Sequence, residues 1–166
     1  MRESAKDDER TVTAKPPELL AIGLLKDAEA YVDGARQLDK AVGGAARFIH
    51  PVYFLLCQAI ELALKGYLAA SGVPYKTLRD EIRHNLEKAL QRAQDFGFDA
   101  ADPRFAELVR WLAPFHLDHS FRYRKTGYIQ LPVASEAAEI IGNTIGPIEQ
   151  YVRNQFMKMR SSALRV

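Results

Sequence analysis

Two arginine–histidine pairs in this chain have the residue types and the spacing for acid–base chemistry on a phosphate ester. A histidine can exchange a proton near neutral pH, and a cation can stabilise the charge that develops on phosphate. The first pair is Arg79 with His84. On one regular helix these two positions lie about 140° apart around the axis, so they do not share a face. We therefore interpret the first pair as a coincidence of spacing.

The second pair is Arg110 with His116, within the segment RWLAPFH. Its residue types permit the same chemistry. Pro114 stands between the two residues and interrupts a regular helical path between them. Each member of the pair is also followed by an apolar residue, Trp111 and Leu117. We keep this pair as the alternative catalytic hypothesis and do not predict catalysis from it.

A third pair, His116 and His119, has a spacing that could hold a metal ion if both residues lay on one helix. Zinc accepts imidazole ligands, but it usually requires three or four protein ligands. The sequence around the pair indicates no clear third and fourth ligand. We predict two solvated loop histidines, no metal and no cofactor.

A polar stripe crosses the most apolar segment of the chain, PVYFLLCQAIELALKGYLAA at positions 51–70. Gln58, Glu61 and Lys65 follow one another at spacings of three and four, so they share one face of a helix. A helix that is otherwise apolar nearly all round belongs at the centre of a bundle, where charges are enclosed only when they are paired. We interpret the stripe as a structural polar seam.

The alternative interpretation is that Glu61 and Lys65 meet His84 or Arg122 and bind a ligand. Arg122 and Tyr123 belong to a long loop that interleaves basic and aromatic residues. Such a loop can bind a nucleotide or RNA by phosphate contact and base stacking. It can equally be a solvated loop whose aromatic rings plug the bundle. The residues predicted for binding are Glu61, Lys65, His84, Arg122 and Tyr123.

Hydrophobic periodicity predicts an all-α fold, an up-down bundle of four to five helices. Glycine and proline separate the helical segments, with Gly43 after the first, Gly72 after the second and Gly97 after the third. We expect Pro114 to end the fourth helix and Pro147 to kink or split the last one. The expected helix-capping residues are Thr77, Asp102 and Ser135.

The ends of the chain are predicted to lie outside the bundle. Residues 1–15 are polar and contain the charge run KDDER, which predicts a disordered tail. Residues 16–160 are expected to form one domain, and residues 161–166 a frayed C-terminus.

The composition excludes few function classes. The chain has 23 Lys and Arg against 21 Asp and Glu, which does not indicate the strongly basic face of a dedicated nucleic-acid-binding protein. The charged N-terminus predicts no secretory signal. The segment 51–70 is long enough to span a bilayer, but Glu61 and Lys65 would each cost about 2.5–3.5 kcal/mol near its centre. We predict a cytoplasmic protein that does not enter a membrane.

Four features together resemble the HEPN superfamily. They are an aromatic residue in the first helix (Tyr31), QAIELALKGYLAASG at 58–72, HNLEKAL at 84–90 and the RY pair at 122–123. The resemblance covers roughly residues 19–151. One departure is Arg83, because the family usually has a small residue before this histidine.

The resemblance implies a four- to five-helix bundle that often forms a homodimer. Some HEPN members are metal-independent ribonucleases that use an arginine and a histidine separated by four to six residues. Others lack this pair and act as partners of nucleotidyltransferases, or as binding modules in stress and phage-defence systems. Our hypothesis is a non-catalytic HEPN-like interaction or ligand-binding module. The alternative is a HEPN ribonuclease built on Arg110 and His116.

Overall fold

The computed structural model describes residues 17–123 and 127–163, and all regular structure within these ranges is helical. The predicted all-α class is therefore confirmed. The predicted tail, residues 1–15, lies outside the described ranges. The elements are α1 (Pro17–Val42), the 3₁₀ turn η1 (Ala46–Phe48), α2 (Ile49–Ala70), the single turn α3 (Tyr75–Thr77), the π-helical turn η2 (Leu78–Ile82), α4 (Leu86–Asp95), α5 (Phe105–Leu117) and α6 (Ala134–Ala163).

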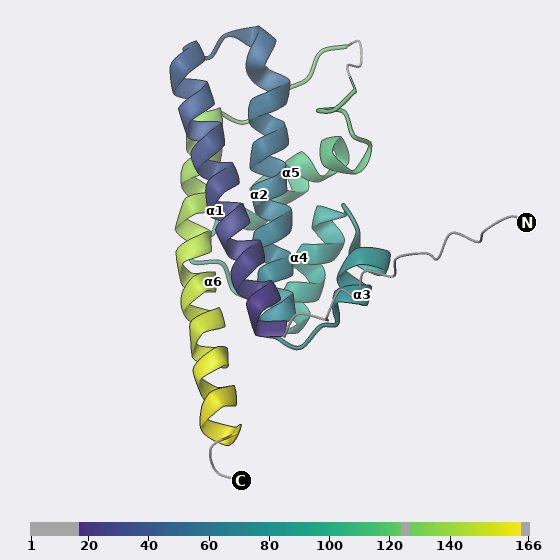
Figure 1. Cartoon of the computed structure of the whole chain (residues 1–166). Helices are drawn as coiled ribbons and strands as arrows, with labels where there is room; N and C mark the ends of the chain where they lie inside the picture. The colour runs from purple at the N-terminus through teal and green to yellow at the C-terminus, as the bar shows by residue number, and fades with distance from the viewer. Residues whose placement is uncertain (1–16, 124–126, 164–166) are drawn as a thin grey trace, which may run out of the picture.

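Three long helices form one side of the bundle. Figure 1 shows α1 and α2 running in opposite directions, with α6 beside both of them and parallel to α2. The shorter elements α3, α4 and α5 lie on the other side of α2. The turn between α1 and α2 uses Gly43 and Gly44, whose φ angles of 57° and 70° suit a residue without a side chain.

The central position of α2 follows from its apolar surface. Its largest side chains without solvent exposure are Leu56, Ile60, Leu64 and Leu68. Helices α1, α4, α5 and α6 all contact it. Within the described residues, Ala46–Ala70 is the one helical stretch long and apolar enough to cross a membrane, and 72% of its most apolar window is buried inside the bundle.

The predicted third helix is not continuous. Its helical conformation is interrupted at residues 83–85, just before α4. Arg83 has a φ of 53°, outside the helical region, and its neighbour His84 lies between two helical elements. Asn85 then caps α4 by accepting a hydrogen bond from the backbone N–H of Lys88. Thr77, the expected cap, makes no capping hydrogen bond. An Asn that can satisfy a free N–H starts a new helix at this point, which the apolar period alone does not reveal.

Pro114 and Pro147 were both expected to disturb their helices, and both lie inside continuous ones. α5 extends beyond Pro114 to Leu117, and α6 is not split at Pro147. Both prolines are on exposed faces, where water can bind the carbonyl that loses its intrahelical partner. α6 also starts at Ala134, so Ser135 is inside the helix, and it continues through residues 161–163.

Candidate functional site

The candidate site is built around the carboxylate of Glu61, which projects from α2 into the interior. Glu61 is one of a few buried polar or charged residues in the described part of the chain, and only 4% of its surface is exposed. A buried carboxylate is expensive unless other groups compensate its charge. The partners of Glu61 therefore identify the site.

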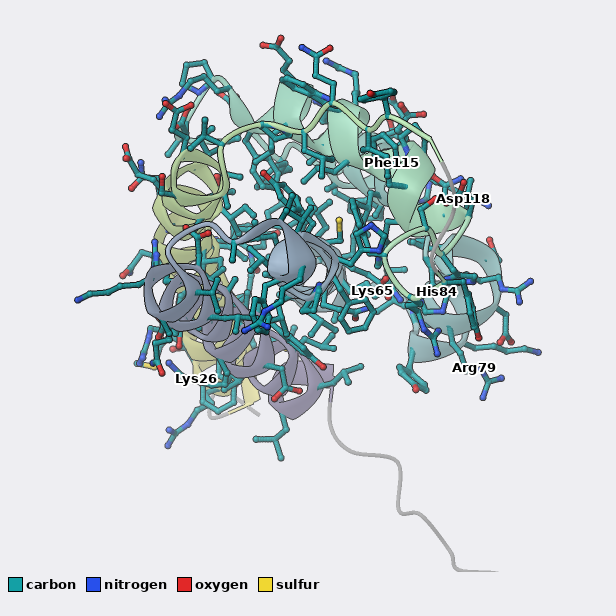
Figure 2. The ribbon with its side chains drawn as sticks, turned by 90° about the horizontal axis from the view of Figure 1, so that it is seen from above. Lys26, Lys65, Arg79, His84, Phe115 and Asp118 are labelled. Carbon is teal, nitrogen blue, oxygen red and sulfur yellow. The ribbon has the colours of Figure 1, made fainter. Side chains whose placement is uncertain are left out.

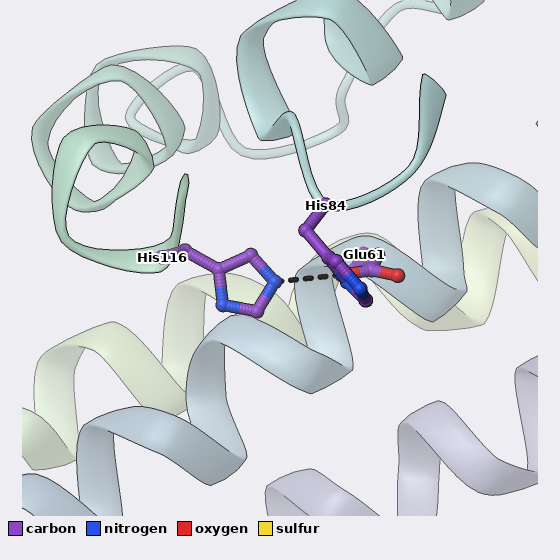
Figure 3. A group of neighbouring side chains, drawn as sticks. All are labelled: Glu61, His84 and His116. Atoms are coloured by element: carbon purple, nitrogen blue, oxygen red, sulfur yellow. Dashed lines mark hydrogen bonds and ion pairs between the residues drawn. The ribbon is translucent and has the colours of Figure 1, made fainter. Parts of the chain in front are cut away.

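Three side chains from three parts of the chain contact this carboxylate, and Figure 3 shows two of them, His84 and His116. Lys65, one turn later on α2, donates to Glu61 Oε1 at 2.6 Å. His84 Nδ1 lies 3.0 Å from Glu61 Oε2, and His116 Nε2 lies 2.6 Å from the same oxygen. We call these four residues, Glu61, Lys65, His84 and His116, the Glu61 cluster.

The partners keep Glu61 ionised. Burial on its own would raise the pKa of this carboxyl. The hydrogen bonds with His116, Lys65 and His84, together with the positive charge of Lys65, outweigh burial and lower the pKa to about 2. The interior of the bundle therefore contains an ionised carboxylate that pairs with Lys65 and is hydrogen-bonded to both histidines.

Local structure explains how the two histidines reach Glu61. His84 occupies the break between η2 and α4, and 48% of its side chain is exposed. His116 lies in the last turn of α5 and is buried, with 4% exposure. The ring of His119, just after α5, is 5.7 Å from the ring of His84. The cluster thus has a buried side at His116 and an accessible side at His84.

A basic pocket of about 540 Å³ opens beside the accessible side. Lys65 and His84 are shared between this pocket and the Glu61 cluster, and Figure 2 shows them side by side, with Arg79 further out on the same side of the bundle. The lining residues of this basic pocket are Leu24, Leu62, Lys65, Tyr75, Leu78, Arg79, Asp80, Arg83 and His84.

Arg122 and Tyr123, the other residues predicted for binding, have different positions. Arg122 lines a small hollow together with Gln58, His84, His116 and other residues, but its volume is only about 10 Å³, room for about one water molecule. The Tyr123 ring is 64% exposed, with the Arg122 guanidinium 5.9 Å from its centre. The structure brings Arg122 next to the cluster and leaves Tyr123 at the surface.

The basic and aromatic loop combines features of both interpretations offered for it. Phe121 is buried and stacks on Tyr53 at 5.7 Å, so one aromatic ring does plug the bundle. Tyr123 and Tyr128 remain exposed. The basic residues Arg124 and Lys125 lie outside the described residues.

The two members of the alternative catalytic pair do not share a pocket. Arg110 is exposed and lines a surface hollow with residues of α4, among them Lys88, and with Asn85, the residue that caps α4. His116 is buried and faces Glu61. Arg79, from the other pair, is exposed and forms an ion pair with its neighbour Asp80 at 2.6 Å.

The sequence predicted Glu61, Lys65 and His84 as binding residues and His116 as a solvated loop residue. The prediction for His116 was wrong, because this residue lies in α5, is buried and contacts Glu61. Arg110 and His119, the residues paired with His116 on sequence grounds, are its neighbours in the chain. The contact with Glu61 spans 55 positions. The sequence feature that could have indicated this contact is a carboxylate on an otherwise apolar helix. When such a carboxylate is buried, it needs compensating partners from elsewhere in the chain.

Comparisons of the chain with protein-family models, curated proteins and solved structures find no match. The HEPN resemblance therefore stays a prediction, and the functional argument depends on the geometry of the site.

Proposed function

We propose that this protein is a non-catalytic, HEPN-like ligand-binding module whose basic pocket takes a phosphate-bearing small molecule of the nucleotide class. The observation that carries the proposal is the convergence of Lys65, Arg79, Arg83 and His84 on one pocket. Its volume of about 540 Å³ falls within the roughly 300–1,000 Å³ typical of small-molecule sites.

Arg83 is the cation best suited to bind a phosphate. Lys65 is already paired with Glu61, and Arg79 with Asp80. Within the described residues, no hydrogen bond is recorded for the Arg83 guanidinium, although its charge helps Arg79 to lower the pKa of Asp80 in the same pocket. A guanidinium can bind phosphate through two parallel hydrogen bonds. Arg83 also has a strained φ of 53°, and such strain concentrates at functional sites.

An aromatic ring at the pocket supports a nucleotide over a bare phosphate. Tyr75 lines the pocket and is 56% exposed. An exposed aromatic ring beside phosphate-binding cations is the arrangement that stacks a base. The apolar side chains of Leu24 and Leu62 give the pocket a hydrophobic wall for the same base.

Calorimetric titration with AMP and ATP, and with uncharged adenosine for comparison, tests this proposal. We expect the nucleotides to bind and adenosine to bind much more weakly. Arg83→Gly should weaken nucleotide binding about tenfold or more, since hydrogen bonds to charged groups contribute about 1.5–3 kcal/mol. The matched control is Arg92→Ala, which removes the same charge from α4 outside the pocket. Absence of nucleotide binding, or equal affinities in the two variants, would refute the proposal.

The HEPN resemblance also supports a protein partner of the nucleotidyltransferase type, in a stress or defence system. Co-purification of the tagged chain with the product of a neighbouring nucleotidyltransferase gene tests this partner. A complex of defined stoichiometry is the expected result, and two separate elution peaks would contradict it.

A further inference from the structure

We propose that Glu61, His84 and His116 form a binding site for a divalent transition-metal ion of the zinc type. One ligand atom from each of the three residues lies within 4.8 Å of the other two. The proposal rests on these three side chains and not on the ligand of the basic pocket, so either proposal can fail without the other.

The donor set fits zinc. Two imidazole nitrogens and one carboxylate oxygen form the three-ligand set of many zinc sites, with metal–ligand distances of about 2.0–2.2 Å. Bound ligands of a tetrahedral ion are therefore about 3–4 Å apart. His84 Nδ1 and His116 Nε2 are already 3.0 Å and 2.6 Å from Glu61 Oε2. Small shifts of the side chains would make room for an ion between them.

Lys65 does not block this site. It donates to Glu61 Oε1, whereas both histidines approach Oε2. A metal bound at Oε2 would leave the Lys65 hydrogen bond intact, and this bond would orient the carboxylate. Such outer partners of a ligand commonly support metal affinity.

Access to the site is asymmetric. Glu61 and His116 are buried at 5% and 4% side-chain exposure, while His84 is 48% exposed. An ion can therefore enter past His84, next to the basic pocket. A three-ligand site with one accessible side leaves a coordination position for water or another ligand.

The competing explanation is a hydrogen-bonded ion-pair network that binds no metal. The two explanations share the observed distances, and they differ in their response to zinc or cobalt. The test uses the full chain stripped of metal by a chelator, then titrated with Co²⁺ and, by calorimetry, with Zn²⁺. We expect one ion per chain, visible d–d absorption bands typical of tetrahedral Co²⁺, and a higher melting temperature in the presence of Zn²⁺.

His84→Ala is the decisive variant, because His84 is half exposed and its removal leaves the buried side of the cluster in place. We expect it to lower zinc affinity about 100-fold or more. Glu61→Gln, which keeps the side-chain shape, should do the same. The matched control is His50→Ala, which removes a histidine that packs on Phe121. Circular dichroism checks that each variant is folded.

Two results would overturn the metal site. One is absence of stoichiometric Zn²⁺ binding by the wild-type chain. The other is zinc affinity that is the same in His84→Ala and His50→Ala. The nucleotide titrations described above are done in the presence of chelator, so their outcome is separate from this one.

Discussion

At the residue scale, the carboxylate of Glu61 contacts three side chains and is almost completely shielded from solvent. Removing it leaves Lys65, which is only 12% exposed, and the buried His116 without their anionic partner. Breaking a buried ion pair by removing one partner typically costs about 3–5 kcal/mol. We therefore expect Glu61→Ala to lower the free energy of unfolding by about this amount, measured by urea denaturation.

The matched control for Glu61→Ala is Glu29→Ala on α1. Glu29 also pairs with a lysine on its own helix, Lys26 at 2.8 Å, but this pair is at the surface. Exposed pairs contribute about 0–1 kcal/mol. Equal costs for the two substitutions would mean that the Glu61 cluster does not stabilise the bundle.

Arg83 combines a strained backbone with a cation that lines the basic pocket, so we expect its substitution by glycine to raise stability and to weaken binding. Glycine adopts a φ of 53° without a steric penalty, whereas other residues pay about 1–3 kcal/mol in such regions. After the greater chain entropy of glycine is subtracted, we expect Arg83→Gly to stabilise the fold by about 1 kcal/mol. Thermal and urea unfolding measure this change.

Arg83→Ala is the comparison variant, because it removes the same side chain and retains the strained backbone. It should not stabilise the protein. If both variants raise stability equally, the charge of Arg83 and not its backbone conformation is the destabilising feature.

At the element scale, the packing of α1 on α2 depends on a glycine. A Cβ atom on Gly66 would lie 3.0 Å from Leu25 Cγ and 3.3 Å from the backbone oxygen of Ala21. Overpacking of this kind costs about 1–3 kcal/mol. Alanine also gains up to about 1 kcal/mol over glycine inside a helix such as α2. We therefore expect Gly66→Ala to destabilise the protein by up to about 2 kcal/mol in urea denaturation.

The same substitution at Gly23 should have the opposite sign. Gly23 is on α1, and a Cβ atom there would have no neighbour within 4 Å. Alanine is favoured over glycine in a helix by up to about 1 kcal/mol. Destabilisation by both substitutions would argue against close α1–α2 contact at Gly66.

The two residues of the ribonuclease hypothesis are both on α5, but they face different neighbours. Arg110 is exposed beside α4, while His116 is buried against Glu61. Acid–base cleavage requires both groups at one phosphate. We expect the purified protein not to degrade single-stranded RNA above a contaminant background, as measured by electrophoresis of a labelled oligonucleotide.

The variants Arg110→Ala and His116→Ala give this assay its control. RNA cleavage that disappears in both variants, with the helical spectrum retained, would establish the ribonuclease alternative. Cleavage that survives in both would identify a contaminant or another site.

At the scale of the whole molecule, we expect a homodimer, as the HEPN resemblance implies. Helix α6 extends past the other helices at its C-terminal end (Figure 1), and Met157 and Met159 there are 60% and 43% exposed. Light scattering at micromolar concentration should give twice the chain mass of 18.7 kDa. A mass of one chain at that concentration would contradict this prediction.

Local sequence patterns were sufficient to predict the positions of the long helices α1 and α2. The apolar period and the glycines after the first two helices placed α1 and α2 to within about two residues of their observed ends. The predicted end of the fourth helix at Pro114 was wrong, and the last helix is not split at Pro147. Pro114 and Pro147 break isolated helices, but here the neighbouring apolar residues of α5 and α6 are buried and keep each helix continuous.

By itself, the sequence determined the all-α class, the central place of α2 and the presence of a polar stripe that needs partners. These properties follow from spacings of three and four residues, which a helix converts directly into faces. Only the tertiary structure decided which partners the stripe receives. His84 and His116 reach Glu61 across 23 and 55 positions of the chain. Those contacts depend on how α4 and α5 pack against α2, and no local spacing encodes this packing.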